Sequence, residues 1–172
     1  PRFFRQLDEQ FSAVAESEHL PLSLAPIHFS TWMGGDRDGN PNVTATVTEE
    51  VTLLARWMAA DLYIKDLNQL RSEFSMSQCN DELRARIGDC SQPYREILRD
   101  LENKMIATRA WAKAKLDGEK VSDQGIILDN QELFADLVLC YQSLMDCGMK
   151  VIANGALLDL IRCAATFGVT LV

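Results

Sequence analysis

The chain has 172 residues, with 25 acidic side chains against 17 basic ones and a formal net charge of -8. A nucleic-acid-binding protein needs a basic face, so this balance argues against nucleic acid as a partner. No apolar run approaches the roughly 20 residues of a membrane-spanning helix, which argues against a membrane protein. The length suggests one domain, and the patterns along the chain predict that it is mainly helical.

The first third of the chain predicts one helix, one strand and one polar loop. An apolar stripe marks a helix from Phe3 to about Ser17. The β-branched and aromatic run 27–33 ends at a glycine pair and predicts a short strand. Residues 34–43 then form a polar loop that is rich in glycine.

A long helix is predicted to open near Thr48 and to run to about Ser75. Thr48 is a plausible N-cap, because its hydroxyl can accept a hydrogen bond from a free backbone N–H. Glu49 and Glu50 would then fall in the first turn, where carboxylates complement the helix dipole.

Capping residues mark the next two helices. Asn80 or Asp81 is expected to cap a short helix that ends at Gly88. A second long helix runs from about Pro93, a favourable first-turn residue, to Leu116.

The last part of the chain predicts two more helices and a strand. Asn130 is expected to cap a helix that ends at about Cys147. A last helix spans 156–167 after Gly155, and Val169–Val172 begins a second strand.

The five cysteines form no Cys-x-x-Cys pair. An odd number without a disulfide framework is typical of a reducing compartment, so we expect a cytoplasmic protein. Cys140 and Cys147 lie one heptad apart on a predicted helix, and we expect both to pack as small apolar residues rather than to bind a metal ion.

The polar loop concentrates residues that packing alone does not require. Asp36 and Asp38 place two anions around Arg37, which can lock a loop or hold a phosphate or carboxylate. A polar, glycine-rich loop after a strand is where barrel and doubly wound proteins place their chemistry. In the alternative interpretation the aspartates bridge Arg37, and Asn40 stabilises its own turn.

This loop closely resembles a segment of the phosphoenolpyruvate carboxylase family, Trp-Met-Gly-Gly-Asp-Arg-Asp-Gly-Asn-Pro, which begins here at Trp32. The resemblance continues over nearly the whole chain, in Cys79-Asn80-Asp81-Glu82-Leu83-Arg84, Pro93-Tyr94-Arg95, Cys140-Tyr141-Gln142-Ser143-Leu144, Ile152-Ala153-Asn154-Gly155 and Phe167-Gly168-Val169.

The resemblance implies a fold and a domain organisation. The family's enzymes are several times longer and are built on a closed barrel of strands with many added helices. Residues 1–172 are therefore expected to be a single, mainly helical internal fragment of a larger (β/α) barrel-type carboxylase. Within it, 26–43 would be a strand plus active-site loop, and 48–168 a helical insertion between two short barrel strands.

The resemblance also implies an activity. The parent enzyme is expected to convert phosphoenolpyruvate and bicarbonate into oxaloacetate and phosphate, with Mg²⁺ or Mn²⁺, as a homotetramer that a phosphorylated activator can regulate. The family's catalytic histidine, glycine-rich arginine loop and metal-binding acids are not among these 172 residues. We therefore expect the isolated chain to be inactive and to bind no metal ion.

The same resemblance assigns a role to the loop. It implies that Trp32 forms an apolar wall beside the methylene of phosphoenolpyruvate, whereas a core tryptophan at a strand end is the alternative. Asp36, Arg37, Asp38 and Asn40 would shape the rim of this substrate pocket.

Arg95 is the second candidate, because the resemblance implies that it belongs to a basic cluster binding a phosphorylated activator. A plain surface arginine is the alternative. The charged side chains that follow, Arg99, Asp100, Glu102 and Lys104, are expected to form a solvated helix face. A rival function for the chain is a non-catalytic helical regulatory or interaction module that binds a phosphometabolite through Arg95.

Overall fold

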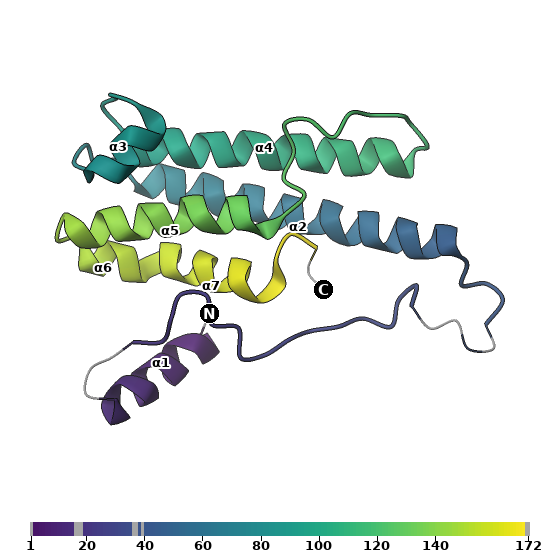
Figure 1. The fold of residues 1–172 in the computed structure, drawn as a ribbon, viewed down its shortest axis with the longest axis horizontal. Coiled ribbons are helices and arrows are strands. Elements are labelled where there is room, and N and C mark those ends of the chain that lie inside the picture. The colour runs from purple at the N-terminus through teal and green to yellow at the C-terminus, as the bar shows by residue number, and fades with distance from the viewer. Residues whose placement is uncertain (1, 16–18, 36–37, 39, 171–172) are drawn as a thin grey trace.

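The computed structural model describes residues 2–15, 19–35, 38 and 40–170. All regular structure in this part of the chain is helical, which confirms the mainly α prediction (Figure 1). The elements are α1 (Arg2–Val14), α2 (Ala45–Glu73), α3 (Asp81–Ile87), α4 (Pro93–Leu116), α5 (Asn130–Asp146), α6 (Lys150–Ile152), the π-type turn η1 (Ala153–Leu157) and α7 (Leu158–Phe167).

The strand predicted at 27–33 is wrong. These residues form no strand, and Ile27 and Phe29 are 39% and 52% exposed. A strand needs a neighbouring strand to pair its N–H and C=O groups, and the described residues offer none. Val169 and Thr170, at the start of the second predicted strand, form a turn. Leu171 and Val172 lie outside the described residues.

Four of the helices form a bundle. α2 and α4 run side by side in opposite directions, and α5 and α7 pack beneath them (Figure 1). Apolar side chains from all four helices meet in one core, and burying them is the main favourable term in folding. Members of this core include Tyr63, Leu67, Leu70, Ile97, Leu98, Leu101, Met105, Leu133, Leu137, Leu144, Leu160 and Ile161.

The N-cap of α2 lies four residues before the predicted one. Thr44 is the N-cap, and its Oγ1 accepts a hydrogen bond from the Val47 backbone N at 3.3 Å. Thr48 lies inside the helix instead and donates its hydroxyl to the Gly34 carbonyl at 2.5 Å. Glu49 and Glu50 therefore lie beyond the first turn.

The caps of the later helices follow the sequence closely. Asn80 caps α3, since its Oδ1 accepts from the Leu83 N at 3.0 Å, and α4 spans Pro93–Leu116 as predicted. α5 is capped by Asp129 rather than Asn130. The Asn130 amide donates to the Ala164 carbonyl at 2.9 Å, which joins α5 to α7 instead.

The last helical segment begins earlier than predicted. The chain is helical from Lys150, and Gly155 interrupts it inside η1 with φ -83° and ψ -135°. α7 then runs from Leu158 to Phe167, where the predicted helix also ends, and Gly168 follows it with a φ of 58°.

The α1 helix lies apart from the bundle and buries none of its described side chains (Figure 1). Arg5 donates two hydrogen bonds to the Asp159 carboxylate, at 2.9 and 2.8 Å. Arg162 of α7 donates to the carbonyls of Leu20 and Pro21, just after α1. These polar contacts hold the segment in place, together with the burial of Leu20, which is 8% exposed.

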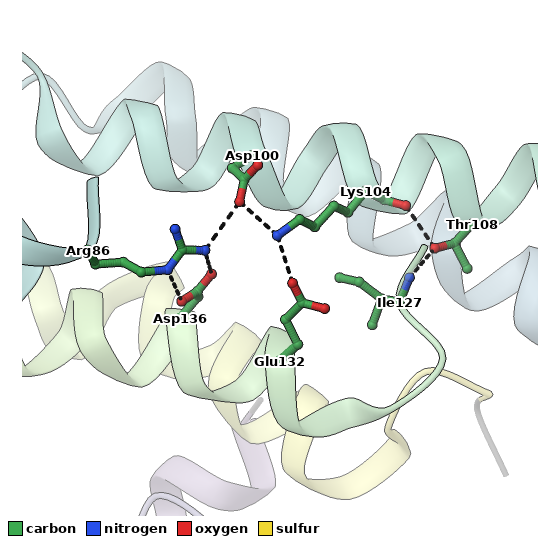
Figure 2. A network of polar contacts seen from close by, with 7 residues as sticks. All are labelled: Arg86, Asp100, Lys104, Thr108, Ile127, Glu132 and Asp136. Carbon is green, nitrogen blue, oxygen red and sulfur yellow. Dashed lines mark hydrogen bonds and ion pairs between the residues drawn. The ribbon is translucent and has the colours of Figure 1, made fainter. Parts of the chain in front are cut away.

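An ionic network joins α3, α4 and α5 (Figure 2). Arg86 of α3 contacts Asp136 of α5 at 2.9 Å and Asp100 of α4 at 3.3 Å. Lys104 of α4 contacts Asp100 at 2.9 Å and Glu132 of α5 at 2.7 Å. Opposite charges therefore alternate along this network and link the three helices.

Candidate functional site

Trp32 is exposed in this chain. It has 80% of its surface open to solvent, and the neighbouring Met33 has 69%. The alternative of a core tryptophan therefore does not describe its surroundings here. Two large apolar side chains displayed side by side are typical of a surface that contacts something else.

A tight turn holds Trp32 and Met33. The Gly35 N donates to the Trp32 carbonyl at 3.2 Å, and the Met33 N donates to Thr31 Oγ1 at 3.1 Å. Gly34, which follows Met33 in this turn, has a φ of +69°, a backbone conformation that disfavours any side chain.

Gly34 also contacts the first turns of α2 closely. A Cβ at this position would lie 3.2 Å from the Thr48 Cα and from the Val51 side chain. The Thr48 hydroxyl donates to the Gly34 carbonyl, as described above. The beginning of α2 therefore fixes the loop, and any side chain at position 34 would be strained.

The other predicted pocket residues are partly described. Asp36 and Arg37 lie outside the described residues. Asp38 and Asn40 are exposed, and Asn40 Oδ1 accepts a hydrogen bond from the Asn42 backbone N at 3.1 Å. Asn40 thus stabilises its own turn, as the alternative interpretation holds, and its role at the rim remains a prediction.

Arg95 is half-buried and contacts the C-terminal end of α2. Its Nε donates to the carbonyls of Arg71 and Phe74, at 3.0 and 2.8 Å. Its Nη2 donates to the Ser72 carbonyl at 3.3 Å, and its Nη1 to Gln92 Oε1 at 3.0 Å. Arg95 therefore pairs carbonyls that the helix itself leaves free at its end.

A hollow opens beside Arg95, and two further arginines line it. Arg71 comes from the last turn of α2, and Arg99 lies one turn after Arg95 on α4. Arg71 contacts Glu102 at 3.2 Å, and Arg99 pairs with Glu96. Three guanidinium groups with two carboxylates leave one net positive charge, so an anion would be attracted.

The two candidate regions lie at opposite ends of α2. The Trp32 loop contacts α2 at Thr48, whereas Arg95 contacts it at Arg71 and Phe74. At 1.5 Å per residue, the helix separates them by roughly 40 Å. One small ligand cannot contact both regions.

Comparison with known proteins identifies the family. The family model described as phosphoenolpyruvate carboxylase matches residues 1–172. The chain belongs to the phosphoenolpyruvate carboxylase family. It is 77% identical to a phosphoenolpyruvate carboxylase of Marinomonas sp. (strain MWYL1), over 100% of this chain and 20% of that protein.

Two further relatives agree. The phosphoenolpyruvate carboxylases of Marinobacter nauticus and Ectopseudomonas mendocina are each 55% identical over the whole of this chain, which covers 19% and 20% of them. The chain thus spans about one fifth of the length of these phosphoenolpyruvate carboxylases. The family resemblance expected from the Trp32 loop is confirmed, and the rival regulatory module is not favoured.

Two further properties bear on this phosphoenolpyruvate carboxylase segment. Across the residues that the structure describes, no group of three His, Cys, Asp or Glu side chains is arranged to hold a metal ion. In the same residues, no helix is long and apolar enough to cross a membrane.

Sequence reasoning missed the arginines beside Arg95. The four-residue spacing of Arg95 and Arg99 on one helix was a usable signal, because such residues share a face. Arg71 could not be found this way, since only the packing of α2 on α4 brings it to the hollow. Glu102 was expected in solvent but is 7% exposed, and it accepts a hydrogen bond from Asn68 at 3.0 Å.

Proposed function

We propose that this chain is part of a phosphoenolpyruvate carboxylase, a carbon–carbon lyase that makes oxaloacetate and phosphate from phosphoenolpyruvate and bicarbonate. The observation that carries the proposal is the family match over residues 1–172, together with a length of one fifth of the relatives. In the proposed parent enzyme, bicarbonate attacks the phosphate, carboxyphosphate and an enolate form, and the enolate carbon captures the released carbon dioxide.

Trp32 is proposed to form the apolar wall of that reaction site. The enolate must meet carbon dioxide before water protonates it, and an apolar surface excludes water. The exposure of Trp32 and the fixed turn at Gly34 support this role, because they present the indole outward on a defined backbone. Asp36, Arg37, Asp38 and Asn40 are proposed to form the rim. Other parts of the barrel-type enzyme would close the pocket.

Mg²⁺ or Mn²⁺ would supply charge stabilisation for the enolate when bound to the parent enzyme. The described residues do not fit such an ion, since they bring no three ligating side chains together. We therefore assign no metal ligand among the described residues, and the contribution proposed for Trp32 is water exclusion.

The hollow beside Arg95 is proposed to bind the phosphate of an activator. Its three arginines support this proposal, and Arg99 is the most exposed of them. The distance of roughly 40 Å from the Trp32 loop suits a regulatory rather than a catalytic role. For the parent enzyme we propose a cytoplasmic homotetramer.

An activity assay of the full-length protein tests the proposal. Purified protein would receive phosphoenolpyruvate, bicarbonate and Mn²⁺, and oxaloacetate would be measured by its reduction with malate dehydrogenase and NADH. We expect oxaloacetate and phosphate in equal amounts, and none when bicarbonate is left out. Phosphate release without oxaloacetate in the complete mixture would contradict the carboxylase assignment.

A further inference from the structure

Three cysteines gather at the end of the bundle where α3 meets the C-terminal end of α5. Cys79 comes just before α3, Cys90 follows α3, and Cys147 is the C-cap of α5. All three are free thiols that are partly open to solvent. They lie outside the Trp32 loop and do not line the arginine hollow.

Hydrogen bonds hold the neighbours of Cys79 and Cys147 against each other. Asn80, directly after Cys79, donates its backbone N–H to Ser143 Oγ at 3.0 Å. Its side-chain amide donates to Asp146 Oδ2 at 2.7 Å, and Asp146 directly precedes Cys147. The segment that carries Cys79 is therefore fixed on the helix end that carries Cys147.

The thiols also influence one another electrostatically. Burial is the main cause that raises the pKa of Cys79, and the charges of Cys147 and, to a smaller extent, Cys90 raise it further against the opposing effect of Arg84. The hydrogen bonds from Asn80 to Ser143 and Asp146, rather than this electrostatic effect, favour Cys147 as the partner of Cys79. A raised pKa also keeps Cys79 mostly protonated near neutral pH.

We propose that Cys79 and Cys147 are an oxidant-sensitive thiol pair, which a peroxide converts reversibly into a disulfide. In the first step the Cys147 thiolate attacks a peroxide oxygen and the O–O bond breaks. Cys147 becomes a sulfenic acid, and the departing hydroxide takes up a proton to give water. Cys147 is assigned the first step because burial raises the pKa of the Cys79 thiol and so lowers its thiolate fraction.

In the second step Cys79 resolves the sulfenic acid. The Cys79 sulfur attacks the Cys147 sulfur, the S–O bond breaks and the S–S bond forms. The Cys79 proton leaves with the hydroxide as a second water. The two thiols lose two electrons in total, and the peroxide gains them.

The disulfide would link the segment between α2 and α3 to the end of α5. It would close a long stretch of chain that contains all of α3, α4 and α5. Such a bond restricts the unfolded chain, so the oxidised protein should unfold at a higher temperature than the reduced protein. An external thiol restores the pair by exchange.

Peptide mapping of the full-length protein tests the pair. The native protein would be treated with hydrogen peroxide, its remaining thiols alkylated without reduction, and its digest analysed by mass spectrometry. We expect one linked peptide that joins Cys79 to Cys147, lighter by about 2 Da for the two hydrogens lost, and its disappearance with dithiothreitol.

Two variants test the roles of individual cysteines. Cys163→Ser removes a thiol of α7 outside the cluster and should leave the linked peptide unchanged. Cys79→Ser should leave a sulfenic acid on Cys147 that dimedone labels. Circular dichroism would confirm that each variant folds. The peptide map of the wild-type protein tests the disulfide even if a variant does not fold.

Other outcomes would overturn the proposal. One is full alkylation of Cys79 and Cys147 after peroxide treatment, with no linked peptide. Another is a linkage that joins Cys90 to Cys79 or to Cys147 in place of the expected pair.

Discussion

At the scale of single residues, Trp32 carries the sharpest prediction. In the full-length enzyme, Trp32→Ala should lower carboxylation roughly tenfold, about 1.4 kcal/mol of transition-state stabilisation. Loss of the apolar wall admits water, so the ratio of pyruvate to oxaloacetate should rise, and a product assay measures both. Trp32→Phe keeps an apolar face and should change the ratio much less. An unchanged ratio and rate in Trp32→Ala would remove the residue from the pocket.

Alanine variants of Arg95 and Arg99 should differ in stability, because only Arg95 bonds to the end of α2. Arg95→Ala removes charge-assisted hydrogen bonds to the end of α2 and should lower the free energy of unfolding by about 1–3 kcal/mol. Arg99 lines the same hollow, makes no such helix-end contact, and should cost little stability when changed to alanine. Thermal unfolding of both variants measures this difference.

The activator should affect both variants alike, although their stabilities differ. If phosphate binds in the hollow, both Arg95→Ala and Arg99→Ala should weaken activation, by roughly tenfold in activator affinity for each lost contact. Activity without activator should stay largely intact. Activation curves with a sugar phosphate measure this, and an unshifted curve for Arg99→Ala would exclude the hollow as the binding site.

At the scale of the elements, the network between α3, α4 and α5 predicts a pH dependence. The hydrogen bond from Lys104, and next the contact with Arg86, lower the pKa of Asp100 in the folded chain. A lowered pKa stabilises the fold above the ordinary aspartate value of about 4, and that stabilisation is lost as the pH falls through the lower, folded value. The contribution of Asp100 to the network should therefore be lost in acid.

Asp100→Asn tests this sign. The variant should be less stable than the wild-type chain near neutral pH, and the difference should shrink as the pH falls below about 4. Urea unfolding of the 172-residue chain at a series of pH values measures it. Asp89→Asn is the matched control, because it removes one charge from an ion pair with Arg84 in which the carboxylate is 96% exposed. A difference that grows toward acid would contradict the prediction.

At the scale of the whole molecule, the chain should not carboxylate phosphoenolpyruvate by itself. It represents about one fifth of the length of its relatives, and a site whose groups act together loses most of its rate when any of them is missing. The coupled oxaloacetate assay on the purified 172-residue chain, with the full-length protein as its control, should give only background. Turnover above background would contradict this prediction and would require a complete active site within these 172 residues.

The sequence by itself determined the helices and the family. Apolar periodicity and local caps, such as Asn80 and Pro93, depend on neighbours a few residues away, so the pattern located α3 and α4 closely. The Trp32 loop identified the family for the same reason, since a long run of unusual residues can be recognised without knowing its tertiary contacts.

Only the tertiary structure decided where distant groups meet. Residues 27–33 have the composition of a strand, yet they form no strand here, because strand pairing depends on a partner far along the chain. Because the helices pack against one another, the Arg95 side chain of α4 donates to the free carbonyls at the end of α2, and Glu102 is buried against Asn68. The same packing brings the segment of Cys79 to the end of α5. Local patterns fix which segments are helical, whereas long-range packing fixes which charges and thiols become neighbours.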